Sequence, residues 1–394
     1  MEQKNTPSRA ARRQSAASRN RQNQGSWLSV LLIGCVVLFL VLSLVTPDRG
    51  FSDSENRKLA QAPAFSWSAL ADGSYFDDLG SYLADQFPGR DGWITMNLAM
   101  NRFFGQKEAS GVYLCRDDYL MQAPGTPDEE NLARNLAAVN AFAAAHPELT
   151  MTMSVVPNAV TVHADKLPAN APVRDQAADL QAISAALTGV EFVDVTKALT
   201  DHSSEYLFYR TDHHWTSLGA YYAFADLAEA LDIDAPALTD YTVYPVSTTF
   251  QGTLSSRSGS HSARDQVDVY AANTDIDYYV TYVDSQKRVA SMYDRSALEK
   301  KDHYTVFFGG NYARVDLTTT ADTERNLLLL KDSYANCFVQ FLYPYFDHII
   351  MVDPRYYYDS LENLVTSQAI TDVLYLYNAD TFLSDSSLAD VLGG

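Results

Sequence analysis

Two short stretches of the sequence carry residue types that acyl-transfer and hydrolytic enzymes use. Asp212, His213 and His214 precede Trp215, and Ser333 follows an apolar run. Asp212 and His214 are two residues apart, so in a turning loop the carboxylate can reach the imidazole Nδ1 and hold the tautomer whose Nε2 can deprotonate a serine. A serine between a strand and a helix suits a nucleophile, because backbone N–H groups there can bind a developing oxyanion.

Each of these residues also has a simpler interpretation. Ser333 could only cap a helix, as serine often does, and the two histidines could be a structural pair with satisfied hydrogen bonds. Metal binding through Asp212 and the histidines is a third interpretation, but catalytic zinc needs three ligands at usable spacing, and no other histidine supplies the third. We therefore expect no metal and, without a glycine-rich phosphate loop, no cofactor.

The elements that must position these residues alternate between strands and helices. Strands are predicted over residues 150–156, 191–195, 327–330, 348–352 and 372–377. Apolar strands separated by helices indicate a mainly parallel sheet covered on both faces. Ligands gather at the carboxyl ends of such strands, so we expect Asn158, Ser333, Arg355 and Asn378 at one crevice. Residues from about 235 to 320 are mostly strand-like and are predicted to be an insertion.

The N-terminal residues differ from the rest of the chain in charge and apolar content. Residues 1–49 hold seven Lys and Arg and two Asp and Glu, whereas the remaining residues hold 22 basic and 47 acidic groups. The uncharged run from Trp27 to Val45 would span roughly 28 Å as a helix, enough to cross a bilayer. We expect an uncleaved transmembrane helix over residues 26–46, with the N-terminus cytoplasmic. A cleaved signal peptide is the alternative.

The charge and the apolar run predict three further segments of the chain. Residues 1–25 are predicted to be a disordered basic tail in the cytoplasm, residues 47–63 a tether, and residues 64–394 an extracytoplasmic domain. The net charge of −20 argues against nucleic acid as a ligand, because such a surface repels phosphates. Outside the predicted span, Cys115 and Cys337 are either small buried side chains or one bridge.

Six short motifs occur in a fixed order along residues 51–380, approximately. They are Ser54–Leu59, Asp85–Asp91, Gly111–Leu114, Val156–Asn158, Asp212–Trp215 and Lys331–Tyr334. Together they resemble the DHHW protein family, which is related to the SGNH-hydrolase-like alginate O-acetyltransferases. The Asp-His-His-Trp motif is the most specific of the six.

The resemblance implies an SGNH-like three-layer α/β/α sandwich in circularly permuted order, because Asp-x-His precedes the serine here. It also implies that Ser333 is the nucleophile, His214 the general base and Asp212 the carboxylate that orients the base. Two features depart from the SGNH hydrolases: Lys331 replaces the glycine of Gly-Asp-Ser, and no Gly-x-Asn-Asp block is present.

These departures leave the oxyanion donors open beyond the backbone N–H of Ser333. Asn158 and Asn336 are the side-chain candidates, with plain loop and helix-surface polarity as the alternative. Aromatic and arginine side chains near the site suit sugars. The substrate-binding candidates are Tyr209, Arg210, Trp215, Arg257, Tyr334 and Arg355. Packing is the alternative role for Trp215, and the segment containing Arg257 either covers the crevice or is a surface loop.

The function expected from the resemblance is O-acetylation of a cell-surface polysaccharide by a membrane-anchored enzyme. A deacetylase or esterase with the same triad, and a non-catalytic carbohydrate-binding or assembly protein, are the alternatives. Because charged acetyl-CoA does not cross a bilayer unaided, the resemblance implies a polytopic membrane-bound O-acyltransferase as the partner that delivers the acyl group.

Overall fold

The computed structural model describes residues 27, 29–52, 54–55 and 57–393. The chain divides into two compact units between Met96 and Asn97. The predicted domain from residue 64 onward therefore extends over parts of both units. The predicted tail over residues 1–25 lies outside the described residues.

The first unit contains a helix, a small hairpin and further helices. Residues 29–45 are helical. Across the described residues, however, no helix combines the length with the apolar composition that crossing a membrane requires. The predicted tether contains an antiparallel hairpin of β1 (Phe51–Ser52) and β2 (Arg57–Lys58). The helices that follow are α2 (Trp67–Asp72), α3 (Ser74–Asp85) and the start of α4 (Arg90–Phe103).

The second unit is built on an eight-stranded sheet in the order β11-β10-β12-β14-β13-β15-β6-β7. The last five strands of this order are parallel, as predicted: β14 (His348–Val352), β13 (Asn326–Lys331), β15 (Asp372–Asn378), β6 (Thr150–Val156) and β7 (Glu191–Phe192). Their carboxyl ends therefore meet at one edge of the sheet, where ligands gather in open parallel sheets.

The remaining three strands come from the interval predicted to be an insertion. β12 (Arg314–Thr319), β10 (Tyr278–Tyr282) and β11 (Lys287–Val289) extend the sheet in antiparallel fashion beyond β14. Val280, Val315 and Leu317 are buried in the main core, so the strands of this interval continue the sheet of the core. Only β8 (Tyr241–Phe250) and β9 (Asp265–Ala272) form a ribbon of their own, with α10 (Thr253–Ser258) between them.

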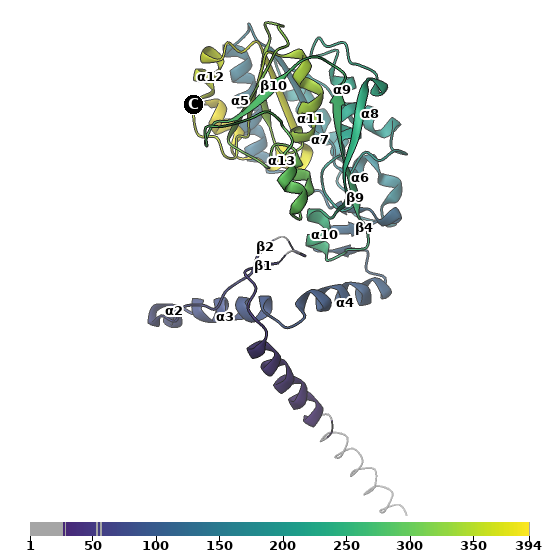
Figure 1. Ribbon diagram of the computed structural model, residues 1–394, viewed down its shortest axis with the longest axis vertical. Coiled ribbons are helices and arrows are strands. Elements are labelled where there is room, and N and C mark those ends of the chain that lie inside the picture. The colour runs from purple at the N-terminus through teal and green to yellow at the C-terminus, as the bar shows by residue number, and fades with distance from the viewer. Residues whose placement is uncertain (1–26, 28, 53, 56, 394) are drawn as a thin grey trace, which may run out of the picture. The chain divides into compact units, whose positions relative to one another are not determined.

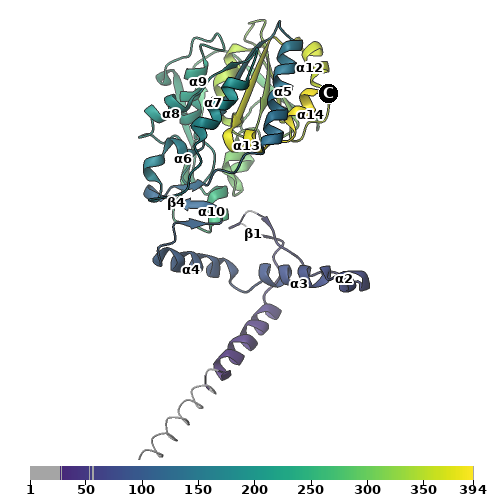
Figure 2. The same ribbon diagram turned by 180° about the vertical axis from the view of Figure 1, so that it is seen from behind.

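Two apolar cores lie on opposite faces of the sheet, because successive side chains of a strand point to opposite sides. In β13, Leu327 and Leu329 belong to one core, and Leu328 and Leu330 belong to the other. Helices α9 (Ser217–Leu227) and α11 (Ala335–Leu342) cover the first face (Figure 1). The second face is covered by α5 (Glu129–Ala145), α7 (Gln176–Ala186), α12 (Leu361–Ser367), α13 (Ala379–Ser384) and α14 (Leu388–Gly393) (Figure 2). The predicted α/β/α layering is confirmed.

A smaller sheet precedes the large one in the second unit. It joins β3 (Glu108–Ala109), β4 (Val112–Leu114) and β5 (Leu120–Gln122) in antiparallel order. The backbone N–H of Leu120 donates to the carbonyl of Arg210 at 2.7 Å. This bond ties the small sheet to the segment that carries the Asp-His-His-Trp motif.

Candidate active site

The segment before α9 forms a tight turn that presents Asp212 and His214. Phe208 and Trp215 pair across it, and the Tyr209 N–H donates to the His214 carbonyl at 3.2 Å. Thr216 then caps α9 by accepting from the Gly219 N–H. The motif is therefore held at both ends by backbone hydrogen bonds.

The structure brings Asp212, His214 and Ser333 into one chain of hydrogen bonds. The His214 Nδ1 lies 2.5 Å from the Asp212 Oδ1, and its Nε2 lies 2.8 Å from the Ser333 Oγ. An ionised carboxylate only accepts, so Nδ1 carries the proton and Nε2 accepts from the serine hydroxyl. Asp212 and His214 are buried, whereas Ser333 is partly exposed. The hydroxyl is thus the member that a substrate can reach.

Asp212 is held in its ionised form by the groups around it. The Thr253 N–H and hydroxyl donate to its Oδ2 at 2.8 and 2.9 Å. Burial raises the pKa of Asp212, but the charges of His213 and His214 and these hydrogen bonds outweigh it and hold the pKa below its usual range. A Cβ added at Gly252 would lie 2.3 Å from this carboxylate, so the close approach requires glycine there.

His213 points to a different partner from His214. Its Nδ1 lies 2.8 Å from the Thr253 Oγ1. Since the Thr253 hydroxyl proton is donated to Asp212, His213 must be the donor to Thr253, which leaves its Nε2 unprotonated. Burial and the charge of His214 lower the pKa of His213 to about 4. His213 is therefore neutral at neutral pH.

Asp212, His213 and His214 are also the described residues whose donor atoms lie near enough to one another to hold a metal ion. Both ring nitrogens of His214 are already hydrogen-bonded, to Asp212 and to Ser333. A metal at this cluster would have to replace the contact between His214 and the serine. The donor set thus fits acyl chemistry better than metal coordination.

Ser333 stands at the turn between β13 and α11, where several groups fix the backbone. Asp332 is fully buried and accepts from the N–H groups of Tyr334 and Asn378 at 2.8 and 2.9 Å. The Tyr304 hydroxyl donates to the Ser333 carbonyl at 2.8 Å, and its ring stacks on His214 with centroids 3.8 Å apart. Tyr304 thus contacts both the nucleophile and the base.

Lys331 is buried beside this turn, at the position where related hydrolases carry glycine. Its Nζ donates to the Asn336 Oδ1 at 2.9 Å and lies 3.8 Å from an Asp353 oxygen. Burial lowers the pKa of Lys331 to about 8, although the charge of Asp353 opposes this change. The ammonium group therefore contacts buried groups at the end of β13 and not the exposed side of Ser333.

The two predicted oxyanion donors are engaged elsewhere. The Asn336 amide nitrogen donates to the Asn311 Oδ1 at 3.1 Å. The Asn158 amide nitrogen lies 3.5 Å from Asn378 and 3.3 Å from Asp380. Among the hydrogen bonds of the described residues, neither side chain reaches Ser333. The Tyr334 N–H is also taken by Asp332, which leaves the Ser333 N–H as the donor predicted from the sequence.

Three of the predicted substrate-binding residues lie in the interior instead. Tyr209, Trp215 and Tyr334 are at most 1% exposed, so they have no surface to offer a sugar, and that expectation is corrected. The Trp215 Nε1–H donates to the Tyr334 carbonyl at 2.9 Å, and its ring stacks on Phe338. Packing, the alternative weighed for Trp215, is its observed role.

The three arginine candidates have different surroundings. Arg355 forms a bidentate pair with Asp353 and lines a groove of about 500 Å³. The Arg257 Nη1 donates to Gln122, which lines the same groove. The Arg210 guanidinium lies over the rings of Tyr119 and Tyr206. The other residues of the groove are Asp380, Thr381, Ser384, Asp385, Ser386 and Ser387.

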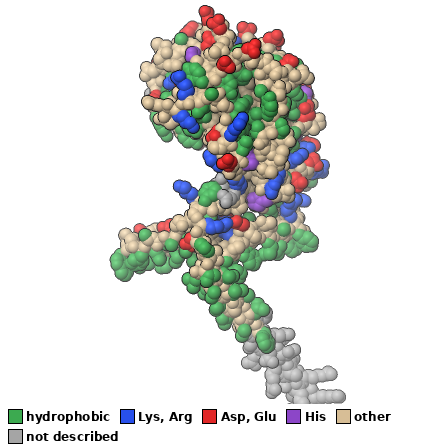
Figure 3. Space-filling model, viewed as in Figure 1, with side chains coloured by type: hydrophobic (Ala, Val, Ile, Leu, Met, Phe, Trp, Pro, Cys, Tyr) green, Lys and Arg blue, Asp and Glu red, His purple; other side chains and the backbone are tan. Residues whose placement is uncertain are grey.

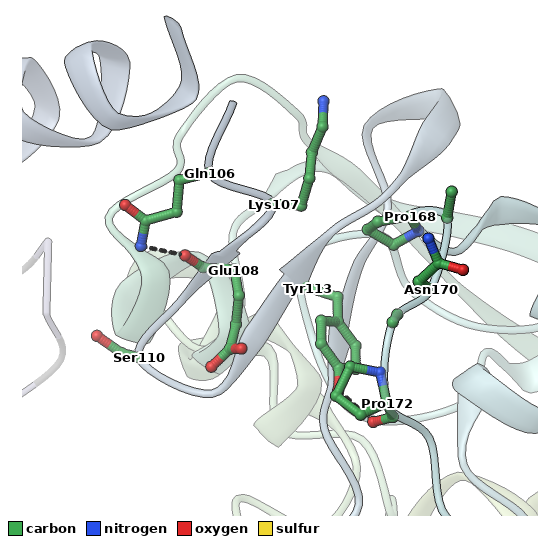
Figure 4. A pocket seen from close by; sticks show the side chains of 10 residues that line it. Gln106, Lys107, Glu108, Ser110, Tyr113, Pro168, Asn170 and Pro172 are labelled. Carbon is green, nitrogen blue, oxygen red and sulfur yellow. Dashed lines mark hydrogen bonds between the residues drawn. The ribbon is translucent and has the colours of Figure 1, made fainter. Parts of the chain in front are cut away.

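A second cavity lies apart from these residues. It measures about 370 Å³ and is lined by Tyr113, Pro168, Asn170 and Pro172 among others (Figure 4). None of the predicted site residues lines it.

Cys115 is half-buried and Cys337 fully buried, and the two thiols are not bridged. Burial raises the pKa of each thiol to about 12, so neither is a ready nucleophile.

Sequence reasoning assigned no role to three residues that shape the site: Thr253, Asp265 and Tyr304. Asp265 accepts from the backbone N–H groups of Arg210 and Thr211, which fixes the turn of the motif. All three lie in the interval interpreted as an insertion, 38 or more residues after the motif. The one signal in the sequence that could have pointed to these residues is that all three are polar and lie near apolar strands.

Comparisons with known proteins bear on the family and the fold of this chain. The model of the family described as "SGNH hydrolase-like domain, acetyltransferase AlgX" matches residues 113–314, and that of the DHHW proteins matches residues 55–119. The first range includes Asp212 and His214 and ends before Ser333. No curated protein sequence matches the chain.

Solved structures are similar to the chain as well. A DHHW family protein from Eubacterium siraeum is 25% identical, with 73% of this chain and 96% of that chain covered and a TM-score of 0.63. PatB1 from Bacillus cereus, determined with a sulfonyl adduct, is 17% identical, with coverage of 70% and 98% and a TM-score of 0.59. The resemblance predicted from the sequence motifs is confirmed, and the similarity to PatB1 supports the fold.

Proposed function

Because the chain belongs to the family of SGNH hydrolase-like domains of the acetyltransferase AlgX, we propose that it is an O-acetyltransferase that modifies a cell-surface polysaccharide through an acyl-enzyme at Ser333. The observation that carries this proposal is the hydrogen-bond chain from Asp212 through His214 to Ser333. Such a chain activates a serine for attack on an acyl carbonyl.

The reaction proceeds in two steps. The His214 Nε2 takes the proton of the Ser333 hydroxyl while the Oγ attacks the carbonyl of an acyl donor, and it returns that proton to the leaving group as the donor's bond breaks. His214 then takes the proton of a sugar hydroxyl, whose oxygen attacks the serine ester. Ser333 leaves with that proton and is restored, and the sugar carries the acyl group.

Asp212 stabilises the imidazolium that forms in each step. Its pKa lies below the usual range for a carboxyl group, so it keeps its negative charge and does not take the proton from His214. The Ser333 N–H is proposed to bind the developing oxyanion. The groove lined by Arg355 and Gln122 supports a polar acceptor, since its wall carries hydroxyl, amide and charged groups that suit sugar hydroxyls.

Membrane anchorage is part of the proposal. Residues 29–45 form a helix whose large apolar side chains, such as Leu31 and Leu40, are exposed, and six Lys and Arg but one Glu precede it in the sequence. We propose an extracytoplasmic location for the acylation site and a polytopic membrane-bound O-acyltransferase as the partner that supplies the acyl group.

The test compares purified full-length protein with Ser333→Ala and His214→Ala variants on an aryl acetate, with and without added oligosaccharide. Acetyl transfer to the sugar is expected in the parent and a loss of about 1,000-fold or more in both variants. Ser360→Ala is the matched control, because this serine precedes α12 without a side-chain cap bond. Acetate release without any transfer would assign an esterase, and full transfer by a folded Ser333→Ala protein would refute the mechanism.

A further inference from the structure

The helices that follow residues 29–45 present large apolar side chains on one side. In α3, Phe76, Leu79 and Leu83 recur at intervals of three and four residues, which places them on one face of the helix. Phe76 is 60% exposed. The opposite face carries Asp78 and Ser81. Thus α3 is amphipathic with its apolar face uncovered, the reverse of what packing in a soluble domain produces.

Helix α4 has the same property. Trp93, Met96, Met100 and Phe103 follow one another at intervals of three and four residues, and all four are exposed, Phe103 to 85%. The other side of the helix carries Leu98, which is buried against Val112, Leu114, Leu120 and Leu254. One face of α4 therefore packs within the second unit, and the apolar opposite face is left bare.

An aromatic cluster joins these faces to the apolar helix of residues 29–45. The ring of Phe39 stacks on Phe87 with centroids 5.1 Å apart, and Trp93 lies 6.0 Å from Phe39 and 6.3 Å from Phe87. Figure 3 shows hydrophobic side chains along α3 and along residues 29–45. The apolar surface of the helix thus continues through the aromatic cluster to α3 and to the start of α4.

We propose that the exposed faces of α3 and α4 lie in the interface of the lipid bilayer, next to the point where the chain leaves it. This inference rests on the membrane anchorage in the proposed function. Trp and Phe prefer the boundary between headgroups and acyl chains, and a helix with one bare apolar face binds there parallel to the membrane plane. We call this surface the interfacial face: Phe76, Leu79, Leu83, Trp93, Met96, Met100 and Phe103.

The charges near the interfacial face decide which force holds it. The polar side of α3 carries the exposed Asp77 and Asp78, whereas Asp85 is buried and paired with Arg57, so anionic headgroups are not attracted to this side. Apolar contact must provide the binding, which is then insensitive to salt.

The test uses full-length protein in vesicles of phosphatidylcholine with phosphatidylglycerol. Spin labels are placed on cysteines introduced at Leu83 and Met100, with Ser81 and Arg102 on the opposite sides of the same helices as matched controls. Cys35 and Cys115 are replaced by serine, and Cys337 is fully buried. The labels at Leu83 and Met100 should collide with oxygen more often than with a water-soluble nickel chelate, and the control labels the reverse. Raising the salt tenfold should leave this pattern unchanged.

Four labels that all behave as in water would overturn the proposal. If they do so in vesicles, yet Leu83 and Met100 are protected in native membranes, the occupant is a membrane protein and the lipid assignment is wrong. In a second arm, M96E/M100E should acetylate glycan in cells at least fivefold less than the R102E control while cleaving a soluble aryl acetate at the parent rate. Absence of cleavage in every protein would reject the proposed function instead, and the label depths would still judge the interfacial face.

Discussion

The Asp212 carboxylate accepts four hydrogen bonds, two from His214 and two from Thr253. The two bonds to each oxygen fix the carboxyl plane, so the imidazole is held in one tautomer. Thr253 in turn orients His213. A single threonine from α10 therefore organises both histidines of the motif, which a sequence motif confined to residues 212–215 does not reveal.

Asp212→Asn should lower the rate of Ser333 acylation by about 1,000-fold or more, because an amide cannot stabilise the imidazolium and favours the wrong tautomer. Thr253→Val keeps the contact between Asp212 and His214 and should cost much less, about tenfold. Stopped-flow acylation by an aryl acetate measures both. Equal losses in the two variants would show that Thr253, and not the charge of Asp212, limits the reaction.

His163 gives a prediction for stability against pH. It is fully buried, and neither ring nitrogen has a hydrogen-bond partner. Burial lowers its pKa to about 4 from an ordinary 6.5. Between these values the unfolded chain binds the proton and the folded chain does not, so the free energy of unfolding falls as the pH is lowered from about 6.5 to about 4.

His163→Phe should remove up to about 3 kcal/mol of this loss, and phenylalanine suits the neighbouring rings of Tyr119 and Phe208. Urea unfolding of the parent and the variant at pH 7.5 and pH 4.5 measures it, since the other titrating groups cancel in the comparison. The assignment fails if the two proteins lose the same stability on acidification.

At the scale of elements, the site depends on three segments that meet at the edge of the sheet. The turn before α9 supplies Asp212 and His214, the turn after β13 supplies Ser333, and α10 supplies Thr253. Trp215 joins the first two turns through its bond to the Tyr334 carbonyl. The interval predicted to be an insertion therefore forms part of the site, because α10 and the segment around Tyr304 both contact the triad.

Gly252→Ala should disturb this meeting of segments. The added Cβ would overlap the Asp212 carboxylate at 2.3 Å, which is backbone-anchored on both sides and cannot turn away freely. We expect acylation to fall more than tenfold, with a melting temperature lowered by a few degrees. Gly125→Ala is the control, as no atom lies within 4 Å of its added Cβ. An unchanged acylation rate in Gly252→Ala would show that α10 can shift without harm.

At the scale of the whole molecule, charge is distributed unevenly along the chain. The net charge is −20, yet residues 1–49 hold seven Lys and Arg against two Asp and Glu. In the proposed orientation, the positive residues would keep the N-terminus in the cytoplasm and the acidic remainder would be translocated. The acylation site and the polysaccharide would then share one side of the membrane.

This orientation predicts the outcome of proteolysis from outside the cell. Protease added to spheroplasts should remove a tag placed after Gly394 and spare a tag placed before Met1, with both digested after detergent is added. Immunoblotting of the two tags measures the result. Protection of the C-terminal tag would place the acylation site in the cytoplasm and contradict the proposed function.

The sequence alone determined much of the architecture, because strand and helix patterns are local. The apolar run of β13 and the spacing in α9 and α11 follow from short-range periodicity, and the motif residues Asp212, His214 and Ser333 could be paired by their chemistry. Only the tertiary structure decided which groups surround them. Ser333 lies 119 residues from His214 in the sequence, and the partners of Asp212 come from α10.

The tertiary structure also decided which of the candidate side chains are buried. Tyr209, Trp215 and Tyr334 looked suited to a sugar by residue type, but the segments that close over them leave no exposed surface. Asn158 and Asn336 looked free to bind an oxyanion, but their amides meet partners from distant strands and loops. Residue type fixes what a side chain can bind, whereas the approach of segments far apart in the chain fixes what it does bind.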